Sequence, residues 1–86
     1  MVMGTVYNED MNPLNLDPRT HQQLEDITQS KNETLVRRAR LILAYADGMQ
    51  TSLAARRAGI SRGRARYWKR EFYQKGMAIF TGHENS

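Results

Sequence analysis

Arginine is the residue type with the clearest chemistry in this sequence. Ten of the 13 Lys and Arg residues are arginines, and five of those ten fall between Arg56 and Arg66. A guanidinium group is a planar fork of donors that matches phosphate oxygens and the O6 and N7 atoms of guanine. Residues 1–30 carry five acidic groups and one basic group, whereas residues 31–86 carry twelve basic and four acidic groups. The formal net charge of +4 thus divides into −4 and +8, which suggests a polyanionic partner but fits a solvated basic face equally well.

A helix is predicted over residues 62–75, with Arg66 and Arg70 on its outer face and Arg62 and Arg64 at the two edges of that face. Ala65, Trp68 and Phe72 are spaced by three and four residues, so they share a face that we expect to pack inward. The opposite face suits the major groove of DNA, where arginines reach guanine edges and phosphates. We predict base contacts from that outer face: Arg62, Gly63, Arg66, Tyr67 and Arg70. We predict phosphate contacts from two helix starts and nearby basic residues: Thr51, Arg56, Ser61, Arg64 and Lys69.

The stretch that leads into this helix has the residue types of a helix-turn-helix motif over residues 51–75. Counted from Thr51, the fifth position must be small so that two helices can cross closely. The ninth must adopt a positive φ, and the tenth, fifteenth and eighteenth must be apolar. The residues at these positions comply: Ala55, Gly59, Ile60, Ala65 and Trp68. The turn pattern favours DNA binding over an ordinary amphipathic helix, while four residues stay open between a DNA contact and a structural or solvated position: Tyr67, Arg37, Arg38 and Arg40.

Capping signals and apolar spacing divide the chain into helices. Four helices are predicted, over residues 18–29, 33–47, 51–58 and 62–75. Their predicted N-caps are Asp17, either Ser30 or Asn32, Thr51 and Ser61. The second helix carries apolar residues on more than one face, with Leu41 and Ala44 away from the main stripe, so we expect it at the centre of the core. Because no segment alternates with a period of two, the predicted fold class is all-α.

The predicted domain organisation places one DNA-binding domain between two flexible ends. Residues 1–16 lack sustained periodicity and are expected to form a flexible, disordered arm, and residues 81–86 a flexible tail. The domain spans residues 17–80, and its motif lies in residues 51–75. The apolar segment Met77–Phe80 is expected to fold back over the core rather than to form a dimer seam.

Composition excludes several classes of function. The chain has no cysteine, which excludes a disulfide scaffold, a cysteine-ligated zinc site and a thiol nucleophile. His21 and His83 are far apart, so we expect no metal site, and Glu25 and Asp26 read as the polar face of a helix. No apolar run approaches the roughly 18–20 residues of a membrane span, which predicts a cytoplasmic, nucleoid-associated protein with no membrane partner. A chain of 86 residues rarely builds both a core and a deep pocket, so we predict no enzymatic activity, no cofactor and no small-molecule substrate.

The chain resembles a family of DNA-binding domains in four stretches: Leu35-Val-Arg-Arg-Ala-Arg-Leu-Ile-Leu-Ala, Asp47-Gly48, Ala55-Arg-Arg-Ala-Gly59-Ile-Ser61 and Ala65-Arg-Tyr-Trp68. They resemble the N-terminal homeodomain-like helix-turn-helix of IS630 and Tc1/mariner transposases, and related stand-alone helix-turn-helix proteins. The resemblance covers about residues 17–80. It implies a homeodomain-like bundle of about four helices that binds double-stranded DNA with the motif's last helix in the major groove. Ser61 would cap that helix, and four residues would face DNA: Arg62, Gly63, Arg66 and Tyr67.

Two departures from the family pattern shape the expected function. Arg64 and Ala65 stand where the family usually has a small hydroxyl residue and a β-branched residue, so Arg64 is expected to clamp a phosphate. The family's metal-binding catalytic domain is not among these 86 residues. We therefore expect sequence-specific DNA binding, as a transposase-type module or a small transcriptional regulator without catalysis of its own. The alternative is a protein-interaction or homodimerisation module that docks through Met77–Phe80 and an exposed Leu41, and RNA binding ranks third because no aromatic platform is present.

Overall fold

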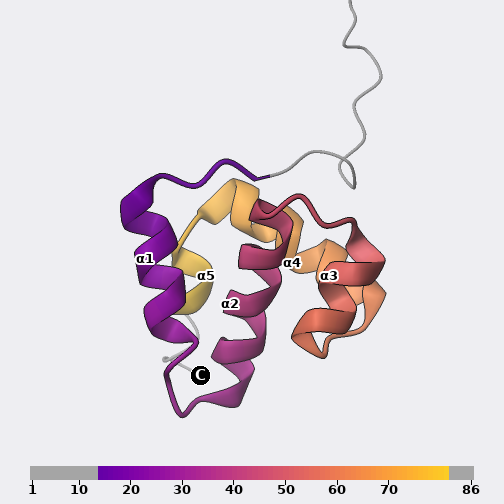
Figure 1. Cartoon of the computed structure of the whole chain (residues 1–86), viewed down its shortest axis with the longest axis horizontal. Helices are drawn as coiled ribbons and strands as arrows, with labels where there is room; N and C mark the ends of the chain where they lie inside the picture. The colour runs from indigo at the N-terminus through magenta and orange to yellow at the C-terminus, as the bar shows by residue number, and fades with distance from the viewer. Residues whose placement is uncertain (1–13, 82–86) are drawn as a thin grey trace, which may run out of the picture.

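Five helices form between residues 14 and 81, the part of the chain that the computed structural model describes (Figure 1). They are α1 (Pro18–Ile27), α2 (Glu33–Ala46), α3 (Thr51–Ala58), α4 (Arg62–Lys75) and α5 (Ala78–Thr81). This part contains no strand, so the prediction of an all-α fold is confirmed. None of these five helices has the length and apolar character needed to cross a membrane. Most of the predicted arm and tail, residues 1–13 and 82–86, lies outside the described residues.

Side chains at the helix starts account for where three helices begin. The Asp17 carboxylate caps α1 by accepting a hydrogen bond from the Thr20 N–H at 3.3 Å, and Pro18 occupies the first helical position. Hydrogen bonding from Thr20, its side chain first, lowers the pKa of Asp17. Asn32 and Ser61 cap α2 and α4 in the same way, because each accepts from the N–H three residues further on. The predicted starts of these helices are therefore confirmed.

Two residues that were candidates for caps have other partners. The Ser30 hydroxyl accepts a hydrogen bond from the N–H of Asn32 at 2.9 Å, so it shapes the turn before α2. Thr51 is the first residue of α3, and the N-cap is Gln50, whose side chain makes no capping bond. The hydroxyl groups of Thr51 and Tyr45 are hydrogen-bonded at 3.0 Å inside the core. The prediction of Thr51 as an N-cap is therefore wrong, because its hydroxyl is used to join α3 to α2.

The helix α2 is the centre of the core, as predicted. It lies between α1 and α3 in Figure 1 and also contacts α4. Its buried apolar side chains point in several directions: Val36, Ala39, Leu41, Ile42, Ala44 and Tyr45. Leu41 is 0% exposed, so the expectation of an exposed Leu41 is wrong. The physical reason is that α1, α3 and α4 all contact α2 and so cover it on more than one side.

Residues outside the four predicted helices complete the core at both ends. Leu14 is buried, and its N–H donates to the carbonyl of Tyr45 at 3.4 Å. At the other end, Ile79 and Phe80 of α5 are buried in the same core cluster. The segment Met77–Phe80 thus folds back over the core, as expected, and most of it forms a helix that the sequence did not predict. Three of its four side chains, those of Met77, Ile79 and Phe80, pack in or against the core.

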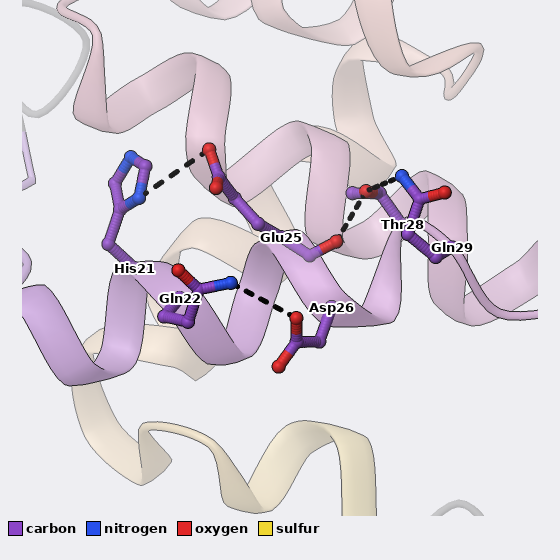
Figure 2. Close-up of polar contacts among 6 residues, drawn as sticks. All are labelled: His21, Gln22, Glu25, Asp26, Thr28 and Gln29. Carbon is purple, nitrogen blue, oxygen red and sulfur yellow. Dashed lines mark hydrogen bonds and ion pairs between the residues drawn. The ribbon is translucent and has the colours of Figure 1, made fainter.

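The outward face of α1 is held by its own side chains (Figure 2). Nδ1 of His21 lies 3.7 Å from Oε2 of Glu25, and Nε2 of Gln22 donates to Oδ1 of Asp26 at 3.1 Å. Figure 2 also shows the Thr28 hydroxyl donating to the carbonyl of Glu25 at 2.6 Å, just after the helix ends. Both carboxylates therefore make contacts one helical turn away, the pattern of an exposed polar helix face. The helix is two residues shorter than predicted because the chain turns at Thr28.

Candidate nucleic-acid interface

A short turn after Gly59 joins α3 to α4 and determines how the two helices meet. Gly59 adopts φ 72° and ψ 36°, the left-handed conformation that glycine reaches without a Cβ penalty. A Cβ at this position would come no closer than 3.8 Å to Nε of Arg37, which is an ordinary contact. The backbone angle, and not a lack of space, therefore requires glycine. Next to it, the N–H of Ile60 donates to the carbonyl of Ala55 at 3.0 Å and closes α3.

The buried residues of α3 and the first inward residue of α4 are small. The helix α3 packs against both α2 and α4. Apart from Thr51, its buried residues are all alanines: Ala54, Ala55 and Ala58. Ala65 of α4 is 0% exposed. Because these side chains end at Cβ, the helices of the motif approach closely, as the small fifth position predicted.

The helix α4 divides into an inner and an outer face. Ala65 and Phe72 are buried and Trp68 is partly buried against the core, as predicted. The five predicted base-contact residues are all exposed: Arg62, Gly63, Arg66, Tyr67 and Arg70. Tyr67 is 45% exposed, and its ring lies edge-on to that of Trp68 with the two centroids 4.9 Å apart. Tyr67 therefore covers the edge of the core and still presents its ring to solvent.

The predicted phosphate-contact residues separate into an exposed group and a buried group. Arg56, Ser61 and Arg64 are exposed. Thr51 and Lys69 are 2% and 1% exposed, respectively. Neither of these two side chains reaches the surface, so the expectation that they contact phosphate is corrected here.

Lys69 is buried because of its position on α4. It follows Ala65 by four residues and precedes Phe72 by three, which places it on the inner face of the helix. Its Nζ lies 4.5 Å from the centroid of the Tyr45 ring on α2, within the range of a cation–π contact. The helical spacing in the sequence already indicates that Lys69 lies on the inner face, whereas its charge alone suggests an exposed position.

Arg38 on α2 is a second buried cation, and it connects three helices. It is 6% exposed, and its guanidinium carbon lies 3.7 Å from the centroid of the Trp68 ring on α4. Its Nη1 donates to the carbonyl of Ile79 on α5 at 2.9 Å. Burial lowers the pKa of Arg38, and the positive charge of Arg64 acts in the same direction. The sequence left open whether Arg38 is solvated or contacts phosphate. The structure shows instead that Arg38 is buried between helices.

An open groove of about 330 Å³ lies between the first half of α2 and the start of α4. Its lining includes three arginines and the turn of the motif: Arg37, Arg38, Arg64, Gly59 and Ser61. Nη2 of Arg37 lies 3.1 Å from Oε2 of Glu33, one turn away on α2, and both side chains are well exposed. This surface, which we call the α2–α4 groove, is strongly positive. Sequence reasoning missed it because its residues come from two helices that only the fold brings together.

A larger groove of the described surface has mixed charge. It has a volume of about 630 Å³ and is lined by residues of α1, α2 and α3 together with Asp47. Both signs of charge occur in it: His21, Glu25, Arg40, Asp47 and Arg57. It lacks the positive excess that would attract a polyanion. Among residues 14–81, no group of three or more His, Cys, Asp and Glu side chains is placed to hold a metal ion.

Comparison with known proteins identifies the central part of this fold. Residues 37–78 match a family model described as a helix-turn-helix domain. The matched segment runs from α2 to the first residue of α5, so it includes the turn at Gly59 and the whole of α4. No curated protein and no solved structure matches the chain. The fold and the match together support the helix-turn-helix prediction, and such a domain suggests DNA binding in general.

Proposed function

We propose that the chain binds double-stranded DNA in a sequence-specific manner, with the start of α4 in the major groove. The observation that carries this proposal is the exposed outer face of α4 after the Gly59 turn. On that face, Arg62, Arg66 and Arg70 each present a fork of donors that fits O6 and N7 of guanine. Tyr67 adds an exposed ring for contact with a base or a sugar. An α-helix about 10–12 Å across fits a major groove about 12 Å wide.

Exposed groups around this face would fix the register of the protein on the DNA backbone. Arg56 and Arg64 are exposed cations on either side of the turn, and Ser61 caps α4 between them. The backbone N–H groups at the starts of α3 and α4 are donors for phosphate oxygens. Contacts of this kind position a protein on the duplex and make its affinity depend on salt.

Within this function, the chain would act as a transposase-type DNA-binding module or as a small transcriptional regulator. The resemblance to the N-terminal domains of IS630 and Tc1/mariner transposases supports this part of the proposal. We further propose that it acts without catalysis of its own, without a cofactor or small-molecule substrate, and in the cytoplasm, in association with the nucleoid.

The test is a titration with a duplex selected from a random pool by binding to the protein. Replacing Arg66 with Ala is expected to weaken binding by about 1–3 kcal/mol, or about 5- to 150-fold, if Arg66 contacts a base. Arg19→Ala is the matched control, because Arg19 is an exposed arginine on α1, a helix on the other side of α2 from α3. Equal affinities of the two variants would remove Arg66 from the interface. Selection of no preferred sequence would contradict the proposal as a whole.

Size-exclusion chromatography beside this titration separates the proposal from its alternative. A dimer that forms without DNA and does not bind duplex would support a protein-interaction or dimerisation module. The apolar surface expected to dock a partner is smaller than the sequence predicts, because Leu41 is buried and Ile79 and Phe80 pack in the core. The same column, run with and without duplex, measures whether the chain forms a homodimer.

A further inference from the structure

The α2–α4 groove brings three guanidinium groups next to the start of a helix. Arg37 and Arg38 come from α2, Arg64 comes from the first turn of α4, and the N-cap Ser61 lies beside them. The N-terminus of α4 adds the positive end of a helix dipole and backbone N–H donors. Like charges placed this close repel one another, and the positive charge of Arg64 lowers the pKa of Arg38 in addition to burial. An anion among these groups would relieve that repulsion.

Arg38, which lines this groove and a second groove between α4 and α5, carries a second observation. Its side chain is more than nine-tenths buried and lines the groove. Its Nη1 is bonded to the Ile79 carbonyl, but its buried Nε has no hydrogen-bond partner among the described residues. A buried donor without a partner carries a desolvation cost, and such groups usually face a water, an ion or a ligand. Stacking on Trp68 holds the guanidinium in place at the wall of the groove.

We propose that the α2–α4 groove holds one backbone phosphate of DNA, bound by Arg37 and Arg64 over the capped start of α4, with Arg38 supplying charge from the wall. This inference rests on the proposed function. Arg64 belongs both to the groove and to the edge of the outer face of α4, so the site is continuous with the proposed interface. Arg37 now forms an exposed ion pair with Glu33, and such pairs contribute little free energy. The Arg37 side chain is therefore able to leave Glu33 and bind a phosphate.

The consequence of this site is a second anchor that does not come from the reading helix. A phosphate held between α2 and α4 fixes the angle at which α4 enters the major groove, because its ligands are on both helices. Arg37 was left open by the sequence and was not among the five predicted phosphate contacts. The proposed role makes it a positioning residue, which would affect all DNA sequences alike.

The first experiment compares Arg37→Ala with Arg40→Ala on the selected duplex and on an unrelated duplex over a range of salt concentrations. Both residues are exposed arginines of α2 and both line a groove beside Glu33, but of the two only Arg37 lines the α2–α4 groove. Affinity falls as salt rises, and loss of one phosphate contact should make the slope of log affinity against log salt shallower by about 0.9. This corresponds to about eightfold weaker binding at 0.1 M salt. We expect this loss for Arg37→Ala on both duplexes and a clearly smaller one for Arg40→Ala. Equal effects of the two variants, while the wild type binds, would overturn the groove site and leave the proposed function standing.

The second experiment uses selected duplexes in which one phosphate at a time is replaced by a neutral methylphosphonate. The wild type should lose affinity at the position that occupies the groove, whereas Arg37→Ala should lose no more there. Trp68 is the single tryptophan of the chain and lines the groove, so its fluorescence should change on duplex binding and change less in Arg37→Ala. A response of Trp68 to inorganic phosphate, with duplex affinity independent of Arg37, would assign the groove to a free anion and overturn the proposal. Absence of duplex binding by the wild type would instead remove the proposed function and this inference together.

Discussion

Replacing Gly59 with Ala tests the conformation on which the motif depends. An L-residue in the left-handed region costs about 1–2 kcal/mol relative to a right-handed one. The loss of glycine's freedom in the unfolded chain returns about 0.4–1 kcal/mol. The new Cβ would make only an ordinary contact, 3.8 Å from Nε of Arg37, so no steric cost is added. The expected net loss is about 1 kcal/mol of unfolding free energy, which for a domain of this size lowers the melting temperature by about 4–8 °C.

Thermal unfolding followed by far-UV circular dichroism measures this effect, with Gly63→Ala as the matched control. Gly63 lies in the first turn of α4, is exposed, and has no atom within 4 Å of where a Cβ would be. The same substitution should therefore stabilise the protein there by about 0.5 kcal/mol, through helix propensity alone. Opposite shifts in the two variants support the left-handed turn at Gly59. A melting temperature of Gly59→Ala at or above that of the wild type would refute the reasoning.

Two further predictions concern the buried cations. Arg38→Ala removes the stacking on Trp68 and the hydrogen bond to the Ile79 carbonyl, so chemical denaturation should show a loss of about 2–4 kcal/mol of unfolding free energy; a loss below about 0.5 kcal/mol would contradict the structural role. Lys69→Met should leave the salt dependence of DNA affinity unchanged because Lys69 is 1% exposed, whereas Arg64→Ala should lower the slope by about 1. A change of about 1 in the slope of Lys69→Met as well would place Lys69 at the DNA after all.

The features that the sequence predicts correctly are those determined by residues close together in the chain. Asp17 before a proline and Ser61 before an arginine-rich helix each specify a start through one capping hydrogen bond. Gly59 specifies the turn through its own backbone, and the spacing of Ala65 and Phe72 specifies the inner face of α4. Each of these signals acts within about one helical turn, so no knowledge of the rest of the fold was needed.

The sequence predictions are wrong in two situations. In one, residue type is considered without the position of the residue on its helix, and in the other, burial depends on contacts with segments far away in the sequence. Lys69 was placed at the surface because of its charge, although its spacing puts it on the inner face of α4. Thr51 was read as a cap, but the partner of its hydroxyl, Tyr45, is on another helix. The exposure of Leu41 depends on which helices cover α2, and the burial of Leu14 depends on a contact with the far end of that helix. Contacts of this kind follow from the assembled fold and have no local signature.

Leu14 and Phe80 belong to one core, so the unit that folds extends at least from the first of these residues to the second. These two residues lie at opposite ends of the described chain and outside the helix-turn-helix itself, yet both are about 5% exposed within one cluster. A fragment trimmed to the matched residues 37–78 would lose both and would also lose the carbonyl that binds Arg38, which is contributed by Ile79. The proposed DNA-binding face lies on one short segment, but the packing that holds α4 in place comes from distant parts of the chain. Substitutions far from α4 in the sequence should therefore alter the stability with which α4 is held.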